Sequence, residues 1–230
     1  EVQSTLARCH ELVDSIANRR VRVKGKEARL NARISIKPSQ FGLHRTDFRT
    51  ESLPPAPDLH AFDLRQRVTL EKMWDVVFHA SERGVSTEID METSHDHEFT
   101  LRAYEVMTRR LHRLGRGGML GIALQANYKN SHEMLRRVLA LPEEEHGGLM
   151  VRLVKGVYTP ATDPHALDER RENETILQNF SVMMWLAHEY EARNPGRLKV
   201  AMASHRDDVH ELADHWQSRE REGLGRFRHE

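Results

Sequence analysis

The segment Val151-Arg152-Leu153-Val154-Lys155-Gly156-Val157-Tyr158 combines the aliphatic residues of a buried strand with two cations, a glycine and a phenol. The interior of a buried strand favours residues such as Val151 and Leu153. Arg152 and Lys155 are costly there unless an anionic or polar partner lies nearby. The segment therefore predicts a strand of a barrel or sheet that delivers its C-terminal residues into a site.

A second segment, residues 86–92, carries the opposite charge. It has the pattern of a strand and ends in Asp90 and Glu92, which flank Met91. Two strand ends of opposite charge form a site suited to a polar, zwitterionic ligand. The two segments together predict a binding site built from the ends of strands.

Composition narrows the class of protein. The chain has 230 residues, one domain by the usual length prior, which is residues 1–230 here. Its 35 basic residues equal its 35 acidic residues, which argues against nucleic acid or an acidic membrane as the main partner. No apolar run approaches the length that crosses a bilayer. Cys9 is the only cysteine, which excludes a disulfide framework and a cysteine-rich zinc site, and a reducing compartment is expected.

Neither end of the sequence shows a feature that marks the natural end of a protein. No signal or transit peptide is visible, and the first residue is Glu1 rather than methionine. The last residues, His229 and Glu230, follow no helix-ending signal. We expect both ends to be cut from a longer protein, and we expect that protein to be cytoplasmic.

Strands and helices are predicted to alternate along the chain. Helical spacing of apolar residues predicts helices at 2–17, 64–82, 98–114, 131–141, 168–192 and 207–220. β-Branched and apolar runs predict strands at 31–37, 85–92, 121–126, 150–158 and 198–204, and Phe227 begins a further one. Residues 44–61, with three prolines, predict a loop that covers part of the molecule.

The alternation predicts an α/β fold. Strands separated by amphipathic helices pair in parallel through right-handed crossovers. Polar residues follow every predicted strand, which is the arrangement of a (β/α)₈ barrel. An open doubly wound sheet shares this rule but more often has a glycine-rich phosphate loop, which is absent. We favour a barrel that is incomplete in this chain, because five strands and a partial sixth cannot close one.

The strand ends, in this order, resemble those of the proline dehydrogenase family, flavin-dependent barrels that oxidise L-proline. The matching segments are Ile34-Ser35-Ile36-Lys37 with Gly42, Ile89-Asp90-Met91-Glu92, residues 121–126, residues 151–158 and Ala203-Ser204-His205. The Arg-Leu-Val-Lys-Gly-Val-Tyr segment is specific for this family. Each of the other segments is a weak match alone, and they support the resemblance only when taken together. The resemblance covers nearly the whole chain. It implies that barrel strands 1 and 8 are missing, with the last helix and its pair of substrate-binding arginines.

The resemblance also implies a cofactor, a substrate and roles for residues. FAD would take the electrons from L-proline, giving Δ1-pyrroline-5-carboxylate, and would pass them to a quinone-type acceptor. Such an enzyme is expected to be cytoplasmic and to associate with the surface of the inner membrane. Asp90 and Arg152 would be catalytic and Lys37 and Tyr158 would bind substrate. Flavin contacts would come from Met91, Gln125, Arg152, Lys155, Gly156, Val157, Ser204 and His205.

Four residues depart from the family pattern. Asn127 stands in place of the usual Tyr and Thr159 in place of a common Trp. Ser204 replaces Thr and keeps its hydroxyl, whereas Arg206 replaces Asn. Asn127 and Arg206 put the details of the flavin contacts in doubt, and with Thr159 they allow a divergent substrate.

Each residue also has a purely structural interpretation. Arg152 would then pair with Asp90 or Glu92 inside the barrel. Gln125 would be a satisfied polar residue at a strand end. Met91 would fill the core. Lys37 would be a lysine at a strand end that lays its aliphatic stem on apolar surface. Tyr158 would be an aromatic residue at the rim of the barrel.

Other functions stay open at this stage. His95-Asp96-His97 has ligand-type residues, but a dedicated zinc site needs three or four convergent ligands, so no metal is predicted. Asp96 or Ser94 as a helix N-cap is the favoured role. A non-catalytic barrel remnant that serves as a binding module is the main alternative to the enzyme. A different barrel enzyme that uses Lys155 to form a Schiff base is another.

Overall fold

The computed structural model describes residues 2–23, 26–29, 32–42 and 62–203, with residues 207, 210, 211 and 214. The longer helices are α1 (Val2–Ala17), α2 (Leu64–Glu82), α3 (His97–Arg113), α4 (Ser131–Leu139) and α5 (Glu169–Arg193). Short 3-10 turns are η1 (Pro38–Phe41), η4 (Ser94–Asp96) and η5 (Glu143–Glu145). The strands are β1 (Arg20–Val23), β2 (Lys26–Arg29), β3 (Arg33–Ile36), β4 (Ser86–Asp90), β5 (Leu120–Gln125), β6 (Leu149–Val154) and β7 (Leu198–Ala203).

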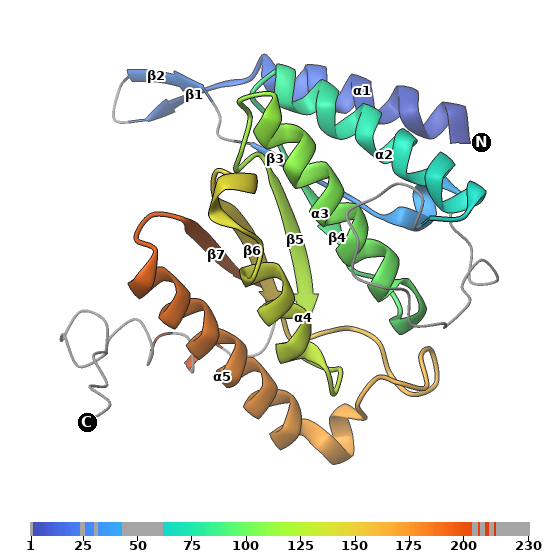
Figure 1. Ribbon diagram of the computed structural model, residues 1–230, viewed down its shortest axis with the longest axis vertical. Coiled ribbons are helices and arrows are strands. Elements are labelled where there is room, and N and C mark those ends of the chain that lie inside the picture. Colours follow the sequence, from blue (N-terminus) through green and yellow to red (C-terminus); the bar gives the residue numbers. More distant parts are fainter. Residues whose placement is uncertain are drawn as a thin grey trace.

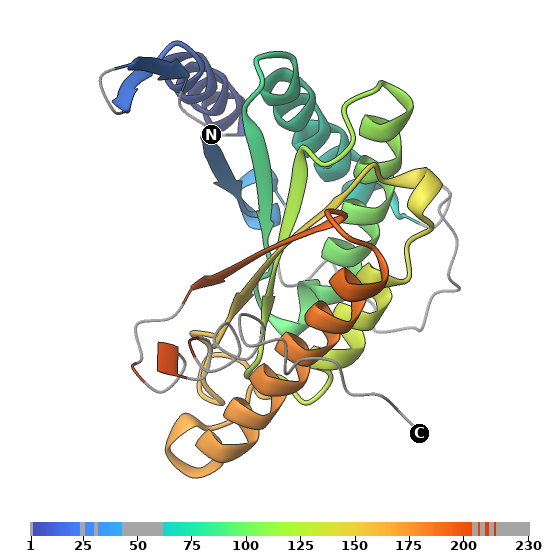
Figure 2. The ribbon, with the colours of Figure 1, turned by 90° about the vertical axis from the view of Figure 1, so that its left-hand side faces the viewer.

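The centre of the molecule is a parallel sheet of five strands in the order β3-β4-β5-β6-β7 (Figure 1). Each strand pairs with the next one in the chain, which is the connectivity of successive strands in a (β/α)₈ barrel. Helices α2 to α5 lie along one face of the twisted sheet (Figure 2). The predicted α/β class and its parallel alternation are confirmed, and the described strands form an open sheet.

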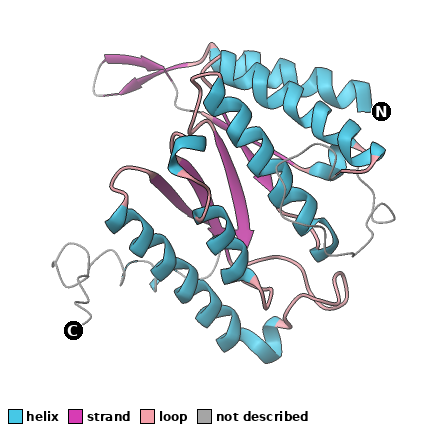
Figure 3. Cartoon of the chain, viewed as in Figure 1, coloured by secondary structure: helices cyan, strands magenta, loops and turns pink. Residues whose placement is uncertain are grey.

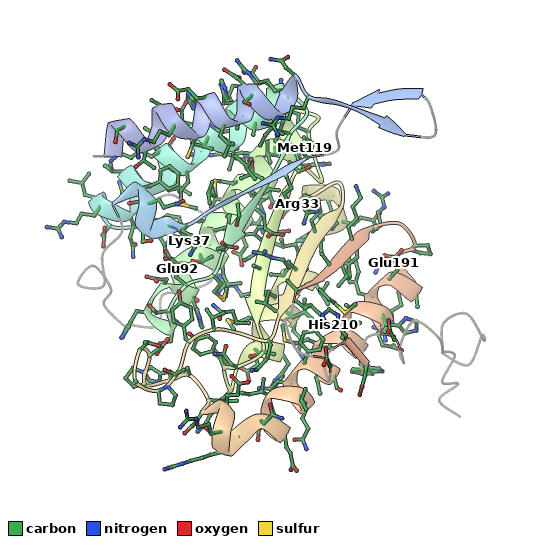
Figure 4. All side chains as sticks on the ribbon, turned by 180° about the vertical axis from the view of Figure 1, so that it is seen from behind. Arg33, Lys37, Glu92, Met119, Glu191 and His210 are labelled. Atoms are coloured by element: carbon green, nitrogen blue, oxygen red, sulfur yellow. The ribbon has the colours of Figure 1, made fainter. Side chains whose placement is uncertain are left out.

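The two faces of the sheet differ in what they bury. In β3, Ile34 and Ile36 are buried and the alternate residues Arg33 and Ser35 are exposed. Successive side chains of a strand point to opposite faces, so the isoleucines pack under the helices and Arg33 lies on the other face. Figure 4 shows this second face, with Arg33 and Lys37 labelled along it. In a closed barrel this face would be the interior.

The central strand β5 is buried along its whole length. All six residues from Leu120 to Gln125 are buried, which fits a strand covered on both faces. Its inward positions are small, with Gly121 paired to Glu88 of β4 and Ala123 paired to both Asp90 and Arg152. Small residues at these positions leave room for longer side chains of β4 and β6 above β5.

Most predicted elements are present, with shifted ends (Figure 3). The predicted strand 150–158 is too long, because β6 ends at Val154 and residues 155–158 are not paired in a ladder. A two-stranded antiparallel hairpin of β1 and β2 was not predicted, although β1 alternates arginine with Val21 and Val23, because β2 is mostly charged and has no such alternation. The predicted loop 44–61, the strand at Phe227 and most of the helix 207–220 lie outside the described residues.

No helix in the described part of the chain is both long enough and apolar enough to span a membrane.

Candidate functional site

The predicted site residues gather at one edge of the sheet, because parallel strands all end on the same side. Asp90 is the last residue of β4, Gln125 is the last of β5, and Lys155 directly follows β6. Lys37 follows β3 and lies toward the same end of the sheet as Glu92 (Figure 4). The structure therefore brings together the predicted residues of β3 to β6.

Arg152 is held by two carboxylates of β4. Its Nη2 donates a hydrogen bond to Asp90 Oδ1, and its Nε lies 2.8 Å from Glu88 Oε1. The second contact is an ion pair and not an aligned hydrogen bond, since Arg152 Nε has no acceptor in line. The predicted structural pairing of Arg152 with Asp90 is confirmed. Its alternative partner Glu92 instead accepts hydrogen bonds from Ser39 N at 2.9 Å and Ser39 Oγ at 2.8 Å.

Glu88 and Arg33 belong to this cluster although neither was predicted as a site residue. Glu88 is 2% exposed, and its Oε2 accepts a hydrogen bond from Arg33 Nη1 at 2.9 Å. Arg33 Nη2 also lies 3.3 Å from Met150 Sδ. A signal was present in the sequence, because Glu88 stands two residues before Asp90 and so faces the same side of β4.

Gln125 is 3% exposed and bonded within the protein. Its Nε2 donates to the carbonyl of Met91 at 2.7 Å and to that of Glu92 at 3.2 Å. Its Oε1 accepts from Val157 N at 3.3 Å. Met91 is 4% exposed and part of the core. These contacts match the structural interpretations of both residues, and their contacts to a flavin stay predictions.

Gly156 is required by its neighbour Asn127. Its φ of 111° lies in the region that favours glycine, and a Cβ there would lie 2.0 Å from Asn127 Oδ1. Asn127 is 2% exposed, and its Nδ2 donates to the Tyr158 carbonyl at 2.8 Å. Asn127, which stands where the family usually has Tyr, therefore constrains the backbone of the segment after β6. This contact was not predicted from the sequence.

The three other residues of that segment have different surroundings. Lys155 is 8% exposed and its Nζ forms an ion pair with Glu169 at the start of α5, so the amine of the Schiff-base hypothesis is engaged by a carboxylate. Val157 is 83% exposed. Tyr158 is half-buried, and burial together with the nearby carboxylates of Glu92 and Asp96 raises the pKa of Tyr158 to about 12. The phenol therefore stays protonated at neutral pH.

A fully buried carboxylate, Asp163, joins three loops at this edge. Its oxygens accept from Ser94 N at 2.6 Å, Ser94 Oγ at 2.7 Å, Tyr128 Oη at 2.9 Å and His165 N at 3.1 Å. Burial alone would raise the pKa of Asp163, but the bonds from Ser94, His165 and Tyr128 lower it to about 2. Nothing in the sequence pattern predicted this network.

The segment His95-Asp96-His97 does not form a metal site. Among the described residues no group of three or more histidine, cysteine or acidic side chains is arranged to hold a metal ion. Asp96 occupies the N-cap position of α3, as predicted, but its carboxylate accepts from Thr93 N at 3.3 Å and Thr93 Oγ1 at 3.1 Å rather than from α3. The predicted alternative cap, Ser94, binds Asp163 instead.

The segment also contains two buried groups whose titration is shifted. Burial of Asp96 raises its pKa to about 6, although the hydrogen bonds from Thr93 oppose this. Burial lowers the pKa of His97 to about 4, against the attraction of Asp163. His97 packs edge-on against the Tyr128 ring with centroids 4.4 Å apart. Both groups are therefore largely uncharged near pH 5.

Ser204 and His205, predicted to contact the cofactor, lie outside the described residues, as does Arg206. Lys37 is exposed, and its backbone N–H donates to Gln40 Oε1 at 2.9 Å. Lys37 and Asp90 lie at the ends of the neighbouring strands β3 and β4.

Solved structures share this fold. Proline utilization A (PutA) from Bdellovibrio bacteriovorus, inactivated by N-propargylglycine, matches with a TM-score of 0.65 and 19% identity, over 94% of this chain and 23% of that one. The PutA mutant D779Y from Bradyrhizobium japonicum matches with a TM-score of 0.63 and 17% identity, over 93% and 21%. The chain thus spans less than a quarter of the length of these proteins.

No curated protein sequence matches the chain. A sequence model of one family, described as proline dehydrogenase, matches residues 1–206. This range includes every strand of the sheet and every strand-end residue discussed above. The resemblance first seen in the strand ends is thereby confirmed, and the chain belongs to the proline dehydrogenase family.

Proposed function

We propose that the protein containing this chain is an FAD-dependent proline dehydrogenase that oxidises L-proline to Δ1-pyrroline-5-carboxylate. The observation that carries the proposal is the pair of Asp90, the last residue of β4, and Arg152, two residues before the end of β6. Their side chains are 22% and 29% exposed on the face that would line a barrel. Barrel enzymes hold their substrates at this end of the strands. Membership of the family supplies the reaction.

The residues at these strand ends fit a flavin by their chemistry. Arg152 offers a partly exposed cation, and Val157, in the segment that follows β6, offers an exposed apolar side chain. In the proposal Arg152 holds the electron-rich part of the ring, and Val157 covers an apolar part. A bound flavin supplies the two-electron acceptor that no side chain provides. Gln125 and Lys155 would contribute less, because their polar groups are bonded within the protein.

The substrate side of the proposal uses Lys37 and Tyr158. Lys37 is exposed at the end of β3 and offers a cation to a carboxylate. Tyr158, with its pKa raised to about 12, presents a neutral hydroxyl that donates a hydrogen bond. Asp90 would lie between these groups and Arg152, so that a zwitterion meets charges of both signs. L-Proline, with a carboxylate and a secondary ammonium, has this chemistry.

The test uses the full-length protein, purified as wild type and as Arg152→Met. The wild type is expected to carry FAD and to reduce a dye when proline is added. Arg152→Met is expected to lower kcat/KM for proline by more than a hundredfold, because it removes a charge that the transition state uses. The matched control is Arg193→Met on α5, whose side chain is 73% exposed, and it should leave kcat/KM unchanged.

One alternative is favoured by a specific observation. Gln125 and Lys155, both predicted to contact the flavin, are bonded to Met91 and Glu169, as expected of a non-catalytic barrel that keeps only its structural contacts. A wild-type protein that takes up no FAD and transfers no electrons from proline would overturn the enzyme and support this alternative.

The proposal also covers the electron acceptor and the cellular location of the protein. We propose that electrons pass to a quinone-type acceptor and that the protein is cytoplasmic and associates with the surface of the inner membrane. Support comes from family membership. Proline-dependent reduction of a soluble ubiquinone analogue, and sedimentation with vesicles of inner-membrane lipid, measure the two parts separately. A protein that reduces dyes but neither reduces the quinone nor sediments would contradict them.

A further inference from the structure

We propose that Glu88 is a positioning residue that fixes the guanidinium of Arg152 and offsets its charge at the flavin site. The inference rests on the proposed function, in which Arg152 faces the flavin. Glu88 itself is 2% exposed and lies deeper in the sheet than Asp90, so it acts on the site through Arg152. The set of site residues predicted from the sequence does not include it.

The path between the two residues runs across the central strand. Glu88 is on β4 and Arg152 is on β6, with β5 between them. The residues of β5 in register are Gly121, opposite Glu88, and Ala123, opposite Arg152. A Cβ added at Gly121 would lie 3.2 Å from Met150 Cβ and 3.6 Å from Glu88 Cγ. The small residues of β5 therefore open the space in which Arg152 reaches the carboxylates of β4.

The contacts fix the guanidinium at two points. Arg152 Nε lies 2.8 Å from Glu88, and Nη2 bonds Asp90. The hydrogen bond to Asp90 and the ion pair to Glu88 hold two neighbouring nitrogens of the planar guanidinium, so together they limit how far that group can turn. Glu88 is anchored in turn by Arg33 at 2.9 Å, so its own carboxylate does not turn freely. Asp90 alone would leave the guanidinium free to rotate about a single contact.

The charges of the cluster balance. Arg33 and Arg152 are cations, and Glu88 and Asp90 are their carboxylate partners, so the formal charges cancel. A buried carboxylate requires such compensation. Neutralising Glu88 leaves one uncompensated positive charge beside the flavin. An added positive charge stabilises the anionic, reduced form of a flavin relative to the oxidised form.

Two predictions follow for Glu88→Gln in the full-length protein. The charge effect raises the midpoint potential of the bound flavin. A tenfold gain in the relative affinity for the reduced form corresponds to about 30 mV for a two-electron couple. The positioning effect raises the rate at which phenylglyoxal labels Arg152 in the flavin-free protein, severalfold, as read by peptide mass spectrometry. The second measurement needs neither flavin nor turnover.

The matched control is Thr87→Val. Thr87 neighbours Glu88 on β4, points to the opposite face, is 1% exposed, and its Oγ1 has no hydrogen-bond partner. This change perturbs the same strand without touching the cluster, so the potential and the labelling of Arg152 should match wild type. Arg33→Met is the second variant. It removes the anchor of Glu88 but leaves the carboxylate facing Arg152, so it should speed labelling of Arg152 less than Glu88→Gln does, whereas general loosening of the sheet would speed it equally in both.

The outcomes separate the two proposals. If the wild-type protein takes up no flavin, the proposed function fails, and the labelling of Arg152 still reports on positioning. If the wild type is an active flavoenzyme but Glu88→Gln changes neither the potential nor the labelling rate, the role of Glu88 is overturned. Equal changes in Thr87→Val would overturn it too, because the effect would then belong to the strand and not to the carboxylate.

Discussion

Two polar networks, one across a face of the sheet and one among the loops at its carboxyl edge, differ in how they are built. The strand cluster consists of Arg33, Glu88, Asp90 and Arg152, whose side chains stand on one face of β3, β4 and β6. The loop network consists of Asp163 with Ser94, Tyr128 and His165, which lie in three loops.

This difference predicts how much stability each network loses when one side chain is removed. Side chains of the strand cluster follow the period of two and the register of the sheet, so their meeting is set by the backbone ladders. The loop network has no such template, and one buried carboxylate holds the loops together. Loss of a single group should therefore cost more stability in the loop network than in the strand cluster.

The largest effect is expected for Asp163→Ala. This change leaves the donors of Ser94 and Tyr128 unpaired in a buried site, which costs about 3 kcal/mol of the free energy of unfolding. The control is Asp168→Asn at the N-cap of α5, where aspartate and asparagine are nearly equivalent and the cost is a few tenths of a kcal/mol. Chemical denaturation measures both. Equal losses would show that Asp163 is no special anchor.

A smaller effect is expected for Gly156→Ala, which tests the contact between the segment after β6 and the β5–α4 loop. The added Cβ would lie 2.0 Å from Asn127 Oδ1 in a left-handed backbone, so we expect a loss of about 2 kcal/mol. Gly196→Ala is the matched control, because its φ is 75° and nothing lies within 4 Å. It should cost about 1 kcal/mol from backbone strain alone. If both changes lower the free energy of unfolding equally, contact with Asn127 is not the reason that residue 156 must be glycine.

The pH dependence of stability tests two neighbours of the loop network. The folded pKa of His97 is lowered to about 4, so its contribution is complete above the unfolded value near 6.5 and is lost as pH falls toward 4. The folded pKa of Asp96 is raised to about 6, so its contribution is complete below the unfolded value near 3.8 and is lost as pH rises through 6. The two slopes oppose each other between about pH 4 and pH 6.

Single variants separate these slopes in thermal unfolding at a series of pH values. Asp96→Asn leaves the His97 slope, so the melting temperature should fall more steeply than in wild type from pH 6.5 to pH 4. His97→Gln leaves the Asp96 slope, so the melting temperature should fall less steeply than in wild type, or rise, from pH 6 to pH 4. Unchanged profiles in both variants would show that neither group titrates in this range.

The strand cluster could be predicted in part from the sequence, whereas the loop network could not. The pairing of Arg152 with Asp90 could be anticipated, because opposite charges at parallel strand ends converge. Glu88 was not predicted, although the same period of two places it on the face of Asp90. Asp163 and Asn127 could not, since loop contacts leave no periodic pattern. The end of β6 was missed for a related reason: a β-branched residue recurs at Val157, but the backbone leaves the ladder at Lys155, whose side chain turns to Glu169.

The smallest effect is expected for Arg33→Met in the strand cluster. Its side chain is 33% exposed and water screens its charge, so the loss should be about 1 kcal/mol of the free energy of unfolding. Glu88 keeps Arg152 as a partner and is therefore not left alone. Arg193→Met, which breaks an exposed i,i+4 pair with Glu189, is the control at about 0.3 kcal/mol. A loss as large as that of Asp163→Ala would contradict the distinction, because the strand cluster would then depend on one charge as the loop network does.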